Sequence, residues 1–200
     1  MGSGRVLAKV VKVLVQEAAN QLSSISRSVE VYRAEMDRLA AMAGVKIAFF
    51  NLHGNQDLTE YCGKEIAKRI ASRNPEVIIT AESKGLQLTH VVARELNQKL
   101  YAVARKSLKL YMQDGISVTV QSITTGGEQT LYLSAHDAAL LKGKRVGIVD
   151  DVISTGGSLK GLEALVEKAG GTVVVKAAVL AEGEAARRHD IVFLETIPLL

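Results

Sequence analysis

The chain has 200 residues, of which 48% are hydrophobic and 23% charged, a composition that can bury one core and predicts a single domain. Its net charge of +4 suits an anionic ligand but is too small to indicate a nucleic-acid-binding protein. The lone cysteine excludes an internal disulfide, and the four histidines lie too far apart for a local zinc motif. We therefore expect a cytoplasmic protein that binds no nucleic acid.

The first 44 residues predict a helical extension in front of the core. Apolar residues recur at helical spacing from Val6 to Leu14, while Lys9 and Lys12 interrupt the apolar run that a signal peptide needs. A second helix is expected over residues 28–43. No stretch reaches the ~18 apolar residues of a membrane-spanning helix, so we expect no membrane association.

Residues 45–182 alternate apolar strands with amphipathic helices. A helix capped by Thr59 and ending near Arg73 comes first, and further helices are expected over 86–97 and 158–169. Short, continuously apolar strands are predicted at 76–80, 100–105, 144–150 and 172–180, with hairpin arms at 116–123 and 129–135. Strands that are apolar on both faces and separated by helices predict an α/β fold, with a mostly parallel sheet flanked by helices.

Two aspartates and a glycine-rich turn follow the third of these strands, in the segment 146–161, VGIVDDVISTGGSLKG. Ligands of such sheets bind beyond the carboxyl ends of the strands. The turn STGGS offers backbone N–H groups, hydroxyls and a helix N-terminus, which together suit a phosphate. It has neither the lysine of a nucleotide triphosphatase loop nor the spacing of a dinucleotide fingerprint.

Asp150 and Asp151 would repel a phosphate but can accept hydrogen bonds from a vicinal diol and can serve as outer partners of Mg²⁺. A phosphorylated sugar satisfies both halves of the motif. Indeed, residues 146–158 resemble the thirteen-residue signature of the type I phosphoribosyltransferases, which bind 5-phosphoribosyl 1-pyrophosphate (PRPP). The resemblance implies that both aspartates contact ribose and Mg²⁺, beneath the cation that develops at the anomeric carbon. It also implies that the 5'-phosphate is bound by Val152, Ile153, Ser154, Thr155, Gly156, Gly157 and Ser158.

Two further segments are similar to other parts of the same family, in the same order. TAESKGL, residues 80–86, resembles the turn that binds pyrophosphate through backbone N–H groups, which assigns Ser83, Lys84 and Gly85 to pyrophosphate. VARKSLKLYMQDG, residues 103–115, resembles a mobile loop that closes over the reaction in adenine phosphoribosyltransferase. On this resemblance Arg105 and Lys109 are catalytic and Lys106 binds substrate, because closure would bring positive charge to the departing pyrophosphate.

The resemblance covers residues 45–182 and implies a small hood over the base, made by the N-terminal helices and residues 183–200. Phe49 and Phe50 could stack on a purine there. Adenine enzymes of the family carry a glutamate in the hairpin, where this chain has Thr124, although Glu128 lies near enough to substitute.

The implied activity is transfer of the phosphoribosyl group from PRPP to a purine, as in adenine phosphoribosyltransferases. A xanthine or guanine enzyme is the alternative, as is a PRPP-binding purine regulator without turnover. A regulator would need a winged-helix DNA-binding domain, for which about 45 N-terminal residues are too few. Family members are usually dimers, so a homodimer is expected.

Overall fold

A computed structural model of the chain describes residues 52–112, 114–121 and 128–197. All of them belong to one compact unit, residues 50–199, which is distinct from a unit formed mainly by residues 1–49. The expectations for the N-terminal helices, Phe49, Phe50 and Thr124 therefore lie outside the described residues. No helix in the described ranges is long and apolar enough to cross a membrane.

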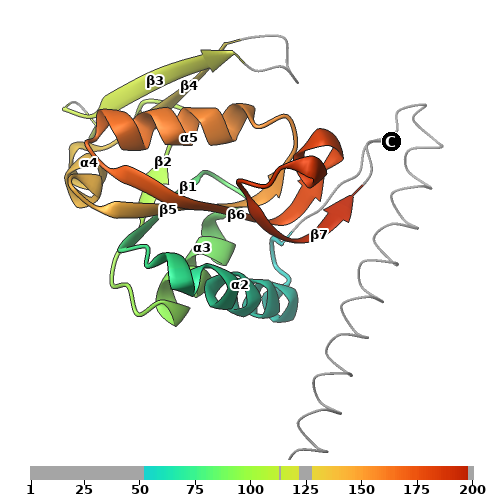
Figure 1. Ribbon diagram of the computed structural model, residues 1–200. Helices are drawn as coiled ribbons and strands as arrows, with labels where there is room; N and C mark the ends of the chain where they lie inside the picture. Colours follow the sequence, from blue (N-terminus) through green and yellow to red (C-terminus); the bar gives the residue numbers. More distant parts are fainter. Residues whose placement is uncertain (1–51, 113, 122–127, 198–200) are drawn as a thin grey trace, which may run out of the picture. The chain divides into compact units, whose positions relative to one another are not determined.

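The centre of the unit is a sheet of five parallel strands in the order β2-β1-β5-β6-β7 (Figure 1). The strands are β1 (Val77–Ala81), β2 (Ala102–Ala104), β5 (Arg145–Ile153), β6 (Thr172–Glu182) and β7 (Val192–Ile197). Every residue of β1 is buried, as expected for a central parallel strand that has helices on both faces. The predicted α/β fold with a mostly parallel sheet is confirmed.

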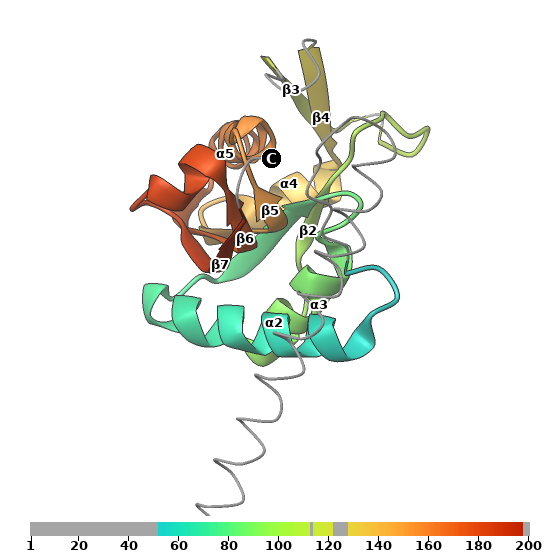
Figure 2. The same ribbon diagram turned by 90° about the vertical axis from the view of Figure 1, so that its right-hand side faces the viewer.

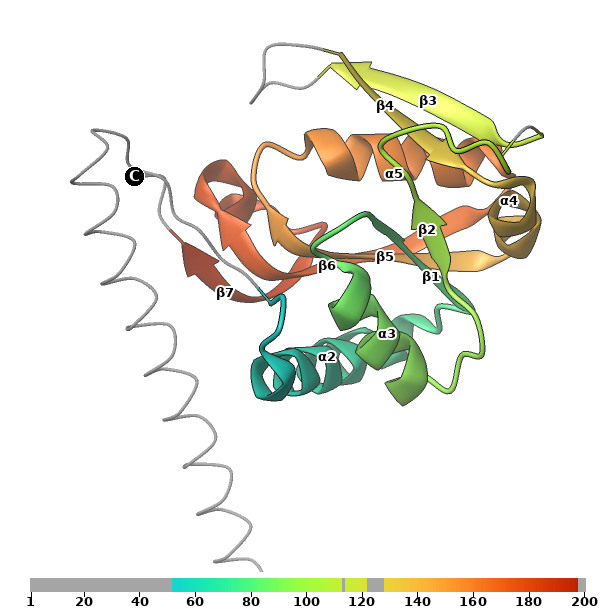
Figure 3. The ribbon, with the colours of Figure 1, turned by 180° about the vertical axis from the view of Figure 1, so that it is seen from behind.

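Helices cover the two faces of the sheet unequally. On one face lie α2 (Gln56–Ile70) and α3 (Leu86–Glu95), and on the other lies α5 (Gly157–Lys168) (Figures 1 and 2). Outside α5 runs an antiparallel hairpin of β3 (Ile116–Gln121) and β4 (Glu128–Leu133) (Figure 3). Short helices complete the unit: α4 (Ala135–Leu141) and two 3₁₀ turns, η1 (Ala71–Arg73) and η2 (Gly183–Arg187).

The strand order creates a switch point between β1 and β5. After β1 the chain crosses over α3 to β2 at one edge, whereas after β5 it crosses over α5 to β6 and β7 at the other. Pairing between β1 and β5 ends at Ile79 and Ile148, although β5 stays paired with β6 as far as Ile153. The two central strands therefore separate toward their carboxyl ends, where open α/β sheets bind their ligands.

Most predicted elements are present, but several boundaries were wrong. The N-cap of α2 is Asn55, whose side chain accepts the Leu58 N–H at 3.1 Å; Thr59 lies inside the helix and its hydroxyl donates to the Asn55 carbonyl at 2.7 Å. Helix α4, capped by Ser134, was not predicted. Residues 192–197 form the edge strand β7 of the main sheet, and a role for residues 183–200 over a base stays a prediction.

Candidate functional site

The turn between β5 and α5 encloses a cavity of about 120 Å³. It is lined by Gln129, Asp150, Val152, Ile153, Ser154, Thr155, Gly156, Gly157, Ser158 and Leu159. Gly156 is the N-cap of α5 with φ +80°, and no side chain in the described part of the chain caps this helix. A residue with a side chain would be strained at that φ, and the first N–H groups of the uncapped helix are available to an anion. The predicted phosphate-binding segment is thus one continuous concave turn.

The two aspartates do not share one environment. Strand β5 runs through both and ends at Ile153, so the expectation that the strand ends at the first aspartate was wrong. Because successive strand side chains point to opposite faces, only Asp150 lines the cavity. Asp151 is 6% exposed, and its Oδ2 has no hydrogen-bond partner among the described residues. The structure therefore places Asp150 in the wall of the cavity and Asp151 outside its lining.

The environment of Asp150 favours a protonated carboxyl group. Burial and the neighbouring carboxylate of Asp151 raise the pKa of Asp150 to about 8, against the opposing effects of the Asp151 N–H and the charge of Lys106. That N–H donates to Asp150 Oδ1 at 2.9 Å. A carboxyl group held in this state ionises when a cation or a hydrogen-bond donor arrives, so Asp150 is prepared for a positively charged or hydroxyl-bearing ligand.

The turn after β1 approaches Asp150 closely. Gly85 is buried, and a Cβ added to it would lie 2.3 Å from Thr80 Oγ1 and 3.2 Å from Asp150 Oδ1. Only glycine fits this contact, which brings the predicted pyrophosphate turn against the predicted ribose site. The peptide bond between Glu82 and Ser83 is cis, Ser83 is exposed and Lys84 is half-buried. The predicted residues Ser83, Lys84 and Gly85 therefore lie beside the switch point.

The predicted mobile loop begins at a firmly held residue. Arg105 pairs through its backbone with Tyr132 of β4, with both N···O distances at 2.8 Å. Its guanidinium contacts Glu82, at 2.9 Å from Nη1 to Oε2. Arg105 therefore lies at the base of the loop, whereas Lys106 and Lys109 are exposed within it. The loop also exposes three apolar or aromatic side chains, Leu108, Leu110 and Tyr111.

Sequence reasoning assigned no role to three polar side chains in or beside the site. Glu82 holds the base of the loop, Gln129 lines the cavity from β4, and Arg188 Nη1 would lie 3.1 Å from a Cβ on Gly156. Glu82 was detectable as an acid that directly follows the buried strand β1. Gln129 and Arg188 carry no local signal, because only tertiary structure brings them to the turn.

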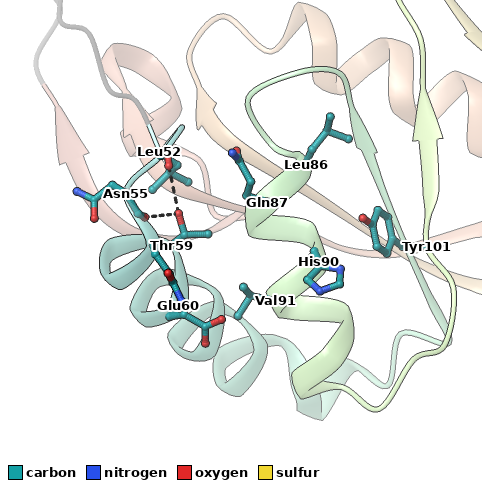
Figure 4. A pocket seen from close by; sticks show the side chains of 11 residues that line it. Leu52, Asn55, Thr59, Glu60, Leu86, Gln87, His90, Val91 and Tyr101 are labelled. Carbon is teal, nitrogen blue, oxygen red and sulfur yellow. Dashed lines mark hydrogen bonds between the residues drawn. The ribbon is translucent and has the colours of Figure 1, made fainter.

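A larger cavity, of about 570 Å³, lies between the N-terminal halves of α2 and α3 (Figure 4). Its wall is mainly apolar and aromatic, with Leu52, Leu86, Val91, His90 and Tyr101. None of the predicted site residues lines it. We assign the candidate site to the smaller cavity because it joins a carboxyl group, an uncapped helix and a glycine turn.

Comparisons with known proteins show which family the chain resembles. The family model described as "Phosphoribosyl transferase domain" matches residues 51–197. The chain is 32% identical to an adenine phosphoribosyltransferase of Brachyspira hyodysenteriae over 137 residues, which are 68% of this chain and 77% of that protein. It is 35% identical to a xanthine phosphoribosyltransferase of Bacillus cereus over 127 residues, 63% of each protein.

Solved structures share the fold. The crystal structure of an adenine phosphoribosyltransferase from Thermoanaerobacter pseudethanolicus superimposes with a TM-score of 0.65 at 25% identity, covering 76% of this chain and 90% of that one.

Proposed function

Because the chain belongs to the phosphoribosyl transferase domain family, we propose that it transfers the 5-phosphoribosyl group of PRPP to a purine base, with release of pyrophosphate. Its adenine and xanthine relatives support a purine as the acceptor. The observation that carries the proposal is the cavity at the end of β5, where Asp150 and the uncapped turn of α5 face the same space.

The site divides into three parts that match the three parts of PRPP. Residues 154–158 bind the 5'-phosphate through backbone N–H groups and hydroxyls, because their turn opens an uncapped helix. Asp150 accepts hydrogen bonds from the ribose hydroxyls. The turn of Ser83, Lys84 and Gly85 binds pyrophosphate, and the contact of Gly85 with Asp150 sets the distance between the two groups.

The chemistry requires positioning and charge stabilisation but no covalent nucleophile. A purine nitrogen attacks the anomeric carbon while the bond to pyrophosphate breaks, and positive charge develops on the ribose. Asp150, once ionised, stabilises that charge from below. Lys106 and Lys109 stabilise the charge that accumulates on pyrophosphate when the loop closes, and Arg105 anchors that loop.

The residues fit a magnesium ion that arrives with PRPP. Among the described residues no three His, Cys, Asp or Glu side chains form a metal-binding group. Mg²⁺ is commonly held by one or two carboxylates together with substrate phosphates and water. Asp150 can supply one such carboxylate, and the buried Oδ2 of the neighbouring Asp151 has no hydrogen-bond partner among the described residues. The ion would neutralise charge on the pyrophosphate group.

The identity of the base is a finer proposal. We favour adenine, as in the Brachyspira relative, and keep xanthine or guanine as the alternative because the Bacillus relatives are xanthine enzymes. Glu128 begins β4 and is exposed, so it lies on the hairpin where the adenine enzymes carry their glutamate. We also propose a homodimer in the cytoplasm, which light scattering and cell fractionation test.

Calorimetry with Mg-PRPP and with ribose 5-phosphate tests the binding site. Replacing Asp150 and Asp151 together by Asn is expected to weaken PRPP binding by at least tenfold, because the ribose acceptor and its charge are lost. Asp57→Asn, which removes an exposed acid from the first turn of α2, serves as the control. Unchanged PRPP affinity in a folded double variant would remove the ribose assignment.

A further inference from the structure

Glu82 joins two parts of the site that are distant in the sequence. It lies directly between β1 and the pyrophosphate turn, and its backbone N–H donates to the Ala104 carbonyl at 2.9 Å. Oε1 accepts the backbone N–H of Lys106 at 2.7 Å, and Oε2 accepts Nη1 of Arg105 at 2.9 Å. One carboxylate thus uses both oxygens to hold two consecutive residues at the base of the loop.

The contacts of the Glu82 carboxylate with Arg105 and Lys106 are strong enough to define where the loop starts. Hydrogen bonds that involve an ionised group are about twice as strong as neutral ones, and the Glu82 side chain is only 19% exposed. Burial would raise the pKa of Glu82, but the bonds from Arg105 and Lys106 outweigh it and hold that pKa below its usual value. Tyr132 also pairs with the backbone of Arg105, so these contacts hold the loop as far as Lys106.

Two cations of the loop lie within electrostatic reach of carboxylates at the site. The positive charge of Lys106 acts on Asp150, and that of Lys109 acts on Glu82. Glu82 is adjacent to Ser83, the first residue of the proposed pyrophosphate turn. A negative charge at this point gathers the loop cations beside the place that pyrophosphate would occupy.

We infer that Glu82 is a positioning residue, which ties the pyrophosphate turn to the base of the loop and so directs Lys106 toward the leaving group. This inference rests on the proposed function. Glu82 itself touches no substrate. Its loss should therefore slow the reaction and loosen the loop while it leaves the binding of PRPP to the β5–α5 turn nearly unchanged.

The test compares Glu82→Gln with Glu76→Gln. Glu76 is a matched control, because its carboxylate also accepts one backbone N–H, from Arg145 at 3.0 Å, and one lysine, Lys144 at 2.9 Å. It lies at the amino end of the sheet, away from the site. For Glu82→Gln we expect kcat to fall at least tenfold, PRPP affinity to stay within threefold, and chymotrypsin cleavage after the exposed Leu110 or Tyr111 to accelerate at least fivefold. Glu76→Gln should match the wild type in all three.

Three results would overturn the inference: cleavage and kcat of Glu82→Gln equal to those of Glu76→Gln, equal acceleration of cleavage in both variants, or a loss of PRPP affinity that explains the whole loss of rate. If Glu82→Gln does not fold, Arg105→Gln removes the same ion pair and should accelerate cleavage equally. A wild type that makes no nucleotide contradicts the proposed function, whereas the cleavage comparison still decides whether Glu82 holds the loop.

Discussion

Replacing Gly85 by alanine adds one methyl group at the closest contact in the site. The backbone of Gly85, with φ −75° and ψ −9°, is one that alanine adopts freely, so backbone strain adds nothing. The cost comes from the 2.3 Å that would separate the new Cβ from Thr80 Oγ1, with Asp150 Oδ1 next at 3.2 Å. An ordinary van der Waals separation is about 3.5 Å, so atoms must move by about 1 Å.

Thr80 cannot provide that movement, since it is fully buried in the central strand β1. The turn itself must shift. Overpacking of this kind costs about 1–3 kcal/mol, which lowers the melting temperature by roughly 2–10 °C for a chain of this size. A displacement of ~1 Å in a group that positions substrate can cost about 10²-fold in rate, and we expect a loss of that order in nucleotide synthesis.

Thermal unfolding and steady-state kinetics measure both effects, and a second substitution isolates their cause. Thr80→Ala removes the Oγ1 atom, so the double variant of Thr80→Ala with Gly85→Ala should recover at least tenfold of the lost rate. A Gly85→Ala protein with wild-type stability and rate, or a double variant no better than the single one, would refute the steric reasoning.

Three other predictions concern single residues. Because burial and Asp151 raise the pKa of Asp150 to about 8 in the folded chain, above its unfolded value of about 3.9, Asp150 favours folding below about pH 4 and loses this contribution as pH rises toward 8. Asp150→Asn should therefore match the wild type in melting temperature near pH 4 and exceed it increasingly up to pH 8. The same difference in melting temperature at pH 4 and at pH 8 would contradict this prediction. Gly156→Val, at φ +80°, should abolish binding of both ribose 5-phosphate and PRPP, as measured by calorimetry. If this variant still bound ribose 5-phosphate normally, the assignment of the phosphate to this turn would be wrong. Lys109→Ala should lower the rate of nucleotide synthesis by about 10²-fold, the effect of losing one charge-stabilising donor, while PRPP affinity changes modestly. If turnover stayed intact, the loop would have no part in catalysis.

The glycine turn between β5 and α5 was predictable because its geometry is local. Glycines, hydroxyls and a helix start lie within a few consecutive residues, so the sequence from Asp150 to Ser158 already contains the donors and the acceptor. The alternation of apolar strands and helices likewise specified a parallel sheet, because only strands covered on both faces read as continuous apolar runs.

Features that depend on distant residues were not predictable. Gly85 looks like any turn glycine until the fold brings Asp150 to 3.2 Å from its missing Cβ. The strand through Asp150 and Asp151 continues to Ile153 because β6 keeps pairing with it. This pairing is between distant residues, so the local sequence around the two aspartates does not reveal it. The role of Glu82 depends on residues 23 and 24 positions away.

Synthesis of nucleotide from Mg-PRPP tests the central claim most directly. The protein is incubated with Mg-PRPP and separately with adenine, hypoxanthine, guanine, xanthine and uracil, and the nucleoside monophosphate and pyrophosphate are quantified. A purine phosphoribosyltransferase should form one equivalent of each product with at least one purine, adenine first, and none with uracil. Tight binding of PRPP without product from any base would contradict the account and indicate a PRPP sensor.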